Sequence, residues 1–390
     1  MLAPSPNLPV PSHTRAIVLL AVAGFASQAM VRVADSILPQ IASDLGVTIG
    51  AASTIVSAYA IMHGSMQLVI GPLGDRFGKY LVVVVATFLC ALTVSAAALA
   101  PGLAVLGLLR LASGATTGAI IPLAMAYLGD VVPYENRQTV LARFLSGQIL
   151  GVVGGQVFGG LFGDTLGWRG IFVALGAIYL AIALLLLNEL RSPRVEKGRQ
   201  PASGWRGIAA GYLRLLQAPR VRVIVGTAFV EAFFFFGAFV YLGAYLRHSF
   251  ALSYLVVGAF LACFGLGGLL YALAVRLLVR HLGERGLVLA GGIVLAVAFA
   301  IIAAIGAGFY MLHNTLQTNA TQMAPQARGT AIASFAFCYF LGQAAGVAAL
   351  GWGVDAFGYA TVFAVAALGL ILVALFFRRR LTPRPAPAPR

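Results

Sequence analysis

Residues 71–79 read Gly-Pro-Leu-Gly-Asp-Arg-Phe-Gly-Lys, a short polar segment between two long apolar runs. The run before it covers residues 49–71, and the run after it covers residues 79–99. A helix needs about 20 residues to cross the roughly 30 Å hydrocarbon layer of a membrane, so each run is long enough for one crossing. The glycines allow a tight turn, and Arg76 and Lys79 add fixed positive charge. The segment therefore predicts a short loop between two transmembrane helices.

The composition extends this prediction to the whole chain. Of the 390 residues, 61% are hydrophobic and only 9% are charged, whereas a soluble domain has roughly 25% charged residues. A water-soluble enzyme is therefore excluded. The net charge of +15 comes mostly from arginines between the apolar runs, which is typical of topology control and not of a nucleic-acid-binding face. We expect a polytopic helical membrane protein that contacts the lipid bilayer and binds no nucleic acid.

Twelve apolar runs are candidates for membrane spans. They lie near residues 15–38, 49–71, 79–99, 102–128, 139–162, 168–189, 221–244, 252–275, 286–304, 305–323, 330–352 and 359–377. Lys and Arg concentrate in alternate connections and after the last run, while Asp44, Asp164 and Asp355 occur in the opposite connections. The positive-inside rule then predicts a cytoplasmic (inner) membrane protein with both termini in the cytoplasm. Residues 286–324 leave no room for a loop between two crossings, yet a single helix there would put the C-terminal arginines outside.

The sequence also repeats itself. Residues at a constant separation of 191 positions match in the pairs Arg137/Arg328, Gly151/Gly342, Gly155/Gly346, Gly160/Gly351, Asp164/Asp355 and Gly167/Gly358. Gly78 matches Gly283 at a longer separation, so the hairpin of the ninth and tenth spans is shorter than its counterpart. Two six-span halves are typical of transporters that rock about a midplane site, and a repeat kept only for packing is the alternative. We expect an N-terminal bundle at 1–190, a cytoplasmic linker at 191–220 and a C-terminal bundle at 221–390.

The segment at 71–79 resembles the cytoplasmic loop signature of the major facilitator superfamily. The match covers Gly71, Leu73, Asp75, Arg76, Gly78 and Lys79. This resemblance implies a cytoplasmic gate, in which Asp75 and Arg76 form a charge network with Asp130 at the end of the fourth span and with Arg137. The alternative is a loop that only sets topology.

Two further motifs resemble signatures of the same superfamily. Arg110 lies deep in the fourth span, in a segment that resembles the family's RxxxG signature. The fifth span resembles the antiporter signature GxxxGPxxGG at Gly151, Gly155, Gly159 and Gly160, with Gln156 in place of proline. The resemblance implies an all-α membrane fold of twelve transmembrane helices in two pseudo-symmetric six-helix bundles, and it favours the drug/proton antiporter branch. Close packing of helices through small residues is the alternative for the glycines.

Ionisable side chains inside the predicted spans are candidates for proton coupling, because charge in the membrane interior is costly and usually functional. Glu231, in the middle of the seventh span, can carry a proton, bind a cationic substrate or form a static pair, and we expect Arg110 to tune it. Asp35 and Arg32 lie one turn apart, for proton access or for mutual neutralisation. An imidazole in water titrates near neutral pH, so His63 is a relay candidate or a packing residue.

Other residues are candidates to line a substrate cavity. They are Gln28, Arg32, Tyr59, Gln67, Tyr241, His313, Asn314, Gln317, Tyr339 and Gln343. The three cysteines show no ligand spacing, so neither a metal site nor a cofactor is expected. The chain has no Walker motif, which leaves an ion gradient as the source of energy.

These observations predict a secondary active transporter and no enzyme activity. We expect a monomer that exports small amphipathic or cationic compounds by alternating access, coupled to protons. One alternative is gradient-driven transport of a metabolite such as a sugar or an amino acid, although three tryptophans are few for a sugar site. The alternative from another class is a membrane sensor or scaffold that does not transport.

Overall fold

The computed structural model describes residues 13–192, 205–298 and 302–381. Within these ranges the chain is helical and contains no strand. The first six helices are α1 (Thr14–Asp44), α2 (Ile49–Phe77), α3 (Lys79–Ala97), α4 (Leu103–Val131), α5 (Tyr134–Thr165) and α6 (Gly167–Leu190). The others are α7 (Trp205–Gln217), α8 (Pro219–Phe250), α9 (Tyr254–Ala298), α10 (Ile302–Gln322), a short 3₁₀ turn (Pro325–Ala327) and α11 (Arg328–Arg380).

Two of these helices are bent so sharply that each consists of two arms. The bends lie at Gly283 in α9 and at Gly358 in α11, where the backbone leaves the helical region with φ of 62° and 78°. With α7 set aside, the described chain thus has twelve helical segments, which agrees with the predicted twelve-span fold class. Nine helices in the described ranges are long and apolar enough to cross a membrane; this count takes α11 as one helix and omits α10 and the second arm of α9.

The bends confirm the repeat seen in the sequence. Gly78 joins α2 to α3 at φ 95°, and its repeat partner Gly283 joins the arms of α9. Gly167 joins α5 to α6 at φ 68°, and its repeat partner is Gly358. Glycine adopts positive φ without the steric penalty that other residues have, so the same tight turn recurs in both halves. The sequence predicts that the ninth and tenth spans meet at residues 304 and 305, whereas α10 already begins at Ile302. Residues 299–301, between α9 and α10, lie outside the described residues.

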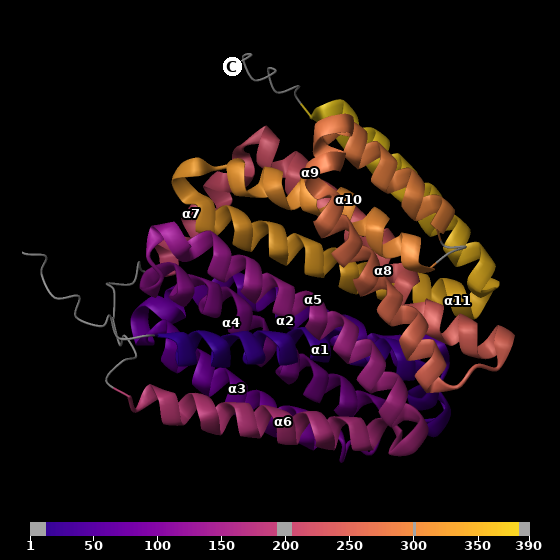
Figure 1. Cartoon of the computed structure of the whole chain (residues 1–390). Helices are drawn as coiled ribbons and strands as arrows, with labels where there is room; N and C mark the ends of the chain where they lie inside the picture. Colours follow the sequence, from indigo (N-terminus) through magenta and orange to yellow (C-terminus); the bar gives the residue numbers. More distant parts are fainter. Residues whose placement is uncertain (1–12, 193–204, 299–301, 382–390) are drawn as a thin grey trace, which may run out of the picture.

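Two groups of helices make up the molecule, with α1–α6 in one bundle and α8–α11 in the other (Figure 1). All backbone hydrogen bonds of a helix are satisfied within it, which suits a chain surrounded by lipid. The short helix α7 precedes the second bundle, and its Tyr212 hydroxyl donates to the Leu68 carbonyl of α2 at 2.9 Å. The domain boundaries at residues 190 and 220 remain a prediction.

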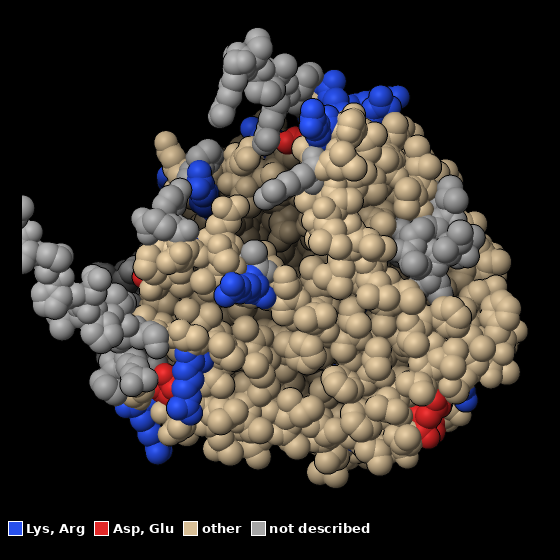
Figure 2. Space-filling view, in the orientation of Figure 1, with Lys and Arg blue, Asp and Glu red and all other residues tan. Residues whose placement is uncertain are grey.

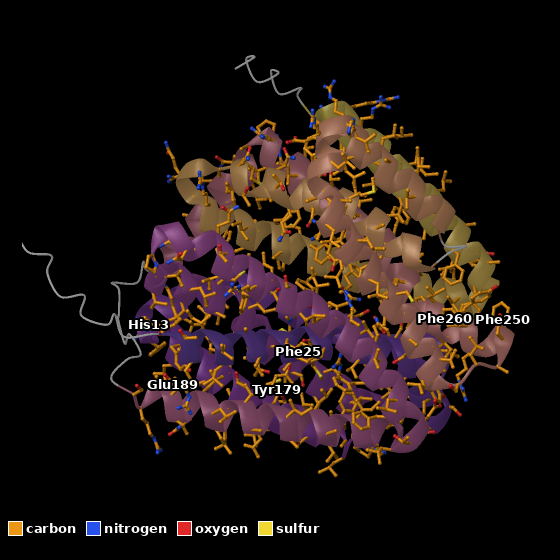
Figure 3. All side chains as sticks on the ribbon, viewed as in Figure 1. His13, Phe25, Tyr179, Glu189, Phe250 and Phe260 are labelled. Carbon is orange, nitrogen blue, oxygen red and sulfur yellow. The ribbon has the colours of Figure 1, made fainter. Side chains whose placement is uncertain are left out.

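The two ends of the bundles differ in charge. We call the end that carries Asp44, Asp164 and Asp355 the acidic end, and the end that carries Arg76, Lys79, Arg137 and Arg378–Arg380 the basic end. His13 and Glu189 lie at the basic end, while Phe250 and Phe260 lie at the acidic end (Figure 3). Figure 2 shows a hollow in the surface, on the side where most of the visible Lys and Arg atoms gather.

Candidate functional site

Glycines bring α5 into backbone contact with α1. A side chain at Gly151, Gly155 or Gly159 would collide with the backbone of Phe25, Ala29 or Val33, respectively. In the second bundle, Gly342 and Gly346 of α11 lie in the same way against Phe229 and Phe233 of α8. Gly160 instead faces the start of α9 across the bundle interface. Small residues permit this close approach, which carries the residues between the glycines onto the neighbouring helices.

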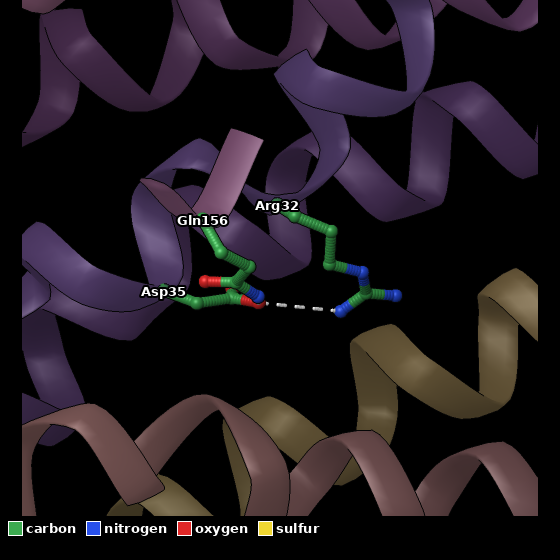
Figure 4. A network of polar contacts seen from close by, with 3 residues as sticks. All are labelled: Arg32, Asp35 and Gln156. Atoms are coloured by element: carbon green, nitrogen blue, oxygen red, sulfur yellow. Dashed lines mark hydrogen bonds and ion pairs between the residues drawn. The ribbon is translucent and has the colours of Figure 1, made fainter. Parts of the chain in front are cut away.

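Asp35 lies at the centre of a buried polar cluster in the first bundle. Its Oδ2 accepts a hydrogen bond from Gln156 Nε2 at 3.1 Å and is 3.5 Å from Arg32 Nη1 (Figure 4). The side chain of Asp35 is fully buried, and that of Arg32 is 5% exposed. Ionised groups are buried in proteins only when they are paired or hydrogen-bonded. The structure therefore unites Asp35 and Arg32 as expected and adds Gln156, which the sequence marked only as a departure from the antiporter signature.

Arg110 is fully buried in α4 next to this cluster. Its guanidinium lies 4.3 Å from the centre of the Tyr59 ring, and Nη1 is 3.6 Å from the Met30 sulfur. Among the described residues, Nε and Nη2 of Arg110 have no hydrogen-bond partner. Stacking on an aromatic face stabilises a desolvated cation, and the charge of Arg110 lies near Asp35. The sequence predicted that Arg110 tunes Glu231, but among the described residues the charged partner of Glu231 is His313.

A polar stripe on α2 is bonded to α4. Tyr59 and His63 both contact the Thr117 hydroxyl, at 2.6 and 3.2 Å, and Gln67 donates to the Gly118 carbonyl at 3.2 Å. His63 also reaches the other bundle, because its ring lies 4.5 Å from that of Phe340 in α11. All three predicted residues of this stripe thus lie at the α2–α4 contact.

Glu231 and His313 form the corresponding buried pair of the second bundle. His313 Nδ1 lies 3.2 Å from Glu231 Oε2, and the Glu231 side chain has no exposed surface. The other carboxylate oxygen has no hydrogen-bond partner within the described ranges. The His313 ring stacks on Phe309 at 4.9 Å and lies 4.7 Å from Tyr339. The acid therefore faces protein, and aromatic rings surround its partner.

Aromatic rings connect the Asp35 cluster of the first bundle with the Glu231–His313 pair of the second bundle. The Arg32 guanidinium lies 3.9 Å from the centre of the Phe236 ring in α8, and Phe236 packs edge-on against Tyr339. Tyr241 donates to Ser53 Oγ at 2.6 Å and lies 2.5 Å from the Val347 carbonyl oxygen. Side chains from both halves of the chain therefore contact one another in the interior of the molecule.

Three of the other cavity candidates lie away from the buried charges, and a fourth is buried with an unsatisfied polar atom. Gln28 lies against Gly151, Asn314 lies beside Tyr271 of α9, and Gln317 is exposed. Gln343 is buried, and its Oε1 has no hydrogen-bond partner in the part of the chain that the structure describes. Within that part, the structure does not bring Gln28, Asn314 or Gln317 into hydrogen-bond contact with Asp35, Arg110 or Glu231.

Two aspartates at the acidic end cross-link the bundles. Asp164, at the end of α5, accepts hydrogen bonds from the Tyr254 and Leu255 N–H groups at the start of α9, at 2.9 and 2.7 Å. Asp355, at the end of the first arm of α11, accepts from Thr48 Oγ1 at 2.7 Å and from the Gly50 N–H at the start of α2 at 3.1 Å. We call these two contacts the acidic-end caps. The repeat pairs Asp164 with Asp355, but from the sequence alone both residues indicate only the topology.

The predicted cytoplasmic gate is partly assembled at the basic end. Lys79 pairs with Asp130, and Arg137 donates to the Val132 carbonyl at 3.3 Å. Arg76 lies over the ring of Phe77, next to it in the chain. Asp75 makes no hydrogen bond or ion pair with any residue that the structure describes. The network that the motif implies between Asp75, Arg76 and Arg137 is therefore not formed in this conformation.

Comparison with known proteins identifies the family. The family model of the Major Facilitator Superfamily matches residues 20–314. The chain belongs to this superfamily. The motif-based prediction of the family is thus confirmed, and the protein is a member of a family of multi-pass membrane transporters.

The individual relatives of this superfamily member are distant. The uncharacterized MFS-type transporter YwfA of Bacillus subtilis is 25% identical over 379 residues, which cover 91% of this chain and 90% of YwfA. The multidrug export protein EmrB of Haemophilus influenzae is 28% identical over 169 residues, which cover 43% of this chain and 33% of EmrB. The crystal structure of the nucleoside transporter NupG superposes with a TM-score of 0.79 at 14% identity, over 94% of this chain and all of NupG, which shows the shared fold.

Proposed function

We propose that this chain is a proton-coupled exporter of small amphipathic or cationic compounds that works by alternating access. We further propose that it is a monomer in the inner membrane, with the basic end and both termini in the cytoplasm. The observation that carries the proposal is the buried Glu231–His313 pair, whose imidazole packs against the rings of Phe309 and Tyr339.

The chemistry of this pair suits an exchange of a proton for a cation. A buried carboxylate must be paired or neutralised, so Glu231 is satisfied either by a proton or by a positive group. A cationic substrate that displaces the proton meets the same need. The rings of Phe236, Phe309 and Tyr339 offer apolar surface and faces that attract cations. Such rings favour compounds that are both hydrophobic and positively charged.

The contacts between the bundles support alternating access. At the acidic end, the acidic-end caps tie α5 to α9 and α11 to α2. At the basic end Asp75 is unpaired among the described residues, and the surface on that side is hollowed (Figure 2). These features support a conformation that is closed toward the acidic end and accepts substrate from the basic end, which we place in the cytoplasm.

The relatives add support for export in particular. EmrB is a multidrug export protein by its name, and its similarity to this chain favours efflux over uptake of a metabolite. A pH gradient and a membrane potential supply the energy, since one charge that crosses 100 mV gains about 2.3 kcal/mol.

The experiment uses purified protein in liposomes with an imposed pH gradient. The wild type should accumulate a lipophilic cationic dye against its concentration gradient, and Glu231→Gln should lose this accumulation while it keeps normal expression and folding. Glu284→Gln is the matched control, because it makes the same chemical change at the Gly283 turn, away from the buried pair. Unchanged accumulation in Glu231→Gln removes this acid from the mechanism, and no movement of any compound in a broad panel by the wild type counts against drug export.

A further inference from the structure

Gln156 stands where the antiporter signature has proline, and it is fully buried. It follows Gly155, the residue that lets α5 touch the backbone of α1 at Ala29. This contact carries the Gln156 amide to Asp35, where Nε2 donates to Oδ2 at 3.1 Å (Figure 4). A proline at this position would supply no such group, so the hydrogen bond is specific to the residue that departs from the signature.

The Asp35–Gln156 pair has one hydrogen atom fewer than two mutual hydrogen bonds require. Asp35 Oδ1 and Gln156 Oε1 are both buried, and neither has a hydrogen-bond donor within the described residues. Buried acceptors without donors are unfavourable. A proton bound to Oδ1 creates an O–H group that can donate to Oε1, while Nε2–H continues to donate to Oδ2. The carboxylic acid and the amide then form a closed pair with two hydrogen bonds.

Few other charges act on this pair. Within the described part of the chain, the charged groups that act on Asp35 are Arg32 from its own helix and Arg110 from α4. The second bundle presents glycines here, since Gly243 of α8 faces the Asp35 carbonyl and Gly258 of α9 faces the Gln156 carbonyl. The pair therefore lies directly behind the surface on which the two bundles meet.

We propose that Asp35 is a second proton site, in the first bundle, and that Gln156 is its positioning residue, pairing with the acid in both of its charge states. The proposal rests on the proton coupling proposed above. One proton converts the carboxylate to the acid and is released when the site ionises, so no other reactant is needed. Asp164 lies in the last turn of α5, so the helix that carries the amide also carries one of the acidic-end caps.

The test replaces the amide with a side chain of similar size that lacks donor and acceptor. In Gln156→Met the neutral acid loses both hydrogen bonds of the closed pair, whereas the carboxylate loses one and no longer faces the unpaired Oε1. Asp35 should then release its proton at lower pH, and the half-maximal pH of dye transport should fall by about one unit with an unchanged KM. Gln156→Leu is the second variant, and Gln148→Leu on the same helix is the matched control.

The effect must depend on Asp35. In an Asp35→Asn background, Gln156→Met should cause no further shift of the pH profile. An unshifted profile in Gln156→Met, or an equal shift with and without Asp35, overturns the proposal.

Infrared spectroscopy tests the Asp35–Gln156 proton site independently of transport. Infrared difference spectra of the purified protein between high and low pH should contain a carboxylic-acid C=O band that is absent in Asp35→Asn. In Gln156→Met and Gln156→Leu the band should move to higher frequency, because its N–H donor is lost. If the band is absent from the wild type, or does not respond to either variant, the Asp35–Gln156 site is refuted even where dye transport is normal. If the band behaves as stated and no compound moves, the proposed export fails and the proton site stands.

Discussion

Removal of the acidic-end caps should open the acidic end in a graded way. Asp164 and Asp355 each accept two hydrogen bonds at a helix start in the opposite bundle, and these bonds exist only while that end is closed. Replacement of a capping side chain by alanine costs about 1 kcal/mol, and we use this central value because both carboxylates are exposed. Each of Asp164→Ala and Asp355→Ala should thus shift the equilibrium from closed to open about 5-fold. The two caps share no partner, so the double variant should shift it by about 2 kcal/mol, or roughly 30-fold.

The assay measures the distance between spin labels across the acidic end. Ser43→Cys on α1 and Phe250→Cys on α8 supply exposed attachment points in opposite bundles, after replacement of Cys90, Cys263 and Cys338. The population of long distances should grow in each single variant and most in the double variant. Asp44→Ala is the control, because Asp44 accepts from Trp168 at 2.9 Å within the same bundle. An unchanged distance distribution in the double variant, or an equal effect of Asp44→Ala, would refute the capping argument.

Three further changes test the packing and the gate. Gly155→Ala should lower the Tm, because the added methyl group meets the Ala29 backbone. Gly147→Ala is the control; its methyl group faces open space and should leave the Tm unchanged or raise it. Equal effects of the two variants would contradict the close contact of α5 with α1. Tyr241→Phe removes the hydroxyl that links Ser53 to α11 and should destabilise the closed acidic end by about 1–3 kcal/mol, seen as a larger long-distance population in the spin-label assay; a wild-type distribution would show that the link contributes nothing. Asp75→Asn should leave this conformation intact and weaken the opposite one, so labels across the basic end should report fewer closed molecules, and a larger closed population would argue against a gate at Asp75.

Much of the fold follows from local sequence features. Apolar runs of sufficient length give the helices, because a backbone in lipid must satisfy its own hydrogen bonds. Gly78 and Gly167 recur as Gly283 and Gly358, and positive φ at all four shows why glycine is required there. The motif at 71–79 led to the superfamily that the family model confirms. The helix ends differ by a few residues, since α5 begins at Tyr134 where the apolar run predicted a start near residue 139.

Local sequence patterns could not predict the partners of the buried charges. Glu231 and His313 are 82 residues apart, and Asp35 and Gln156 are 121 residues apart, so only the packing of the bundles brings them together. The sequence named the two acids and His313 as candidates but gave no reason to pair Glu231 with His313. Gln156 was visible only as a missing proline. The acidic-end caps have a sequence signal, the repeat of Asp164 as Asp355, but the repeat does not reveal which helix start each carboxylate meets.

The most direct test of proton-coupled export is a simultaneous record of proton and substrate movement in one vesicle preparation. The interior of liposomes that contain the wild type is loaded with a pH-sensitive dye, and a cationic substrate is added outside with the membrane potential clamped. We expect that substrate entering the vesicles drives protons out, and that Glu231→Gln abolishes the proton movement. Substrate transport by the wild type without any accompanying change in internal pH would contradict proton-coupled export.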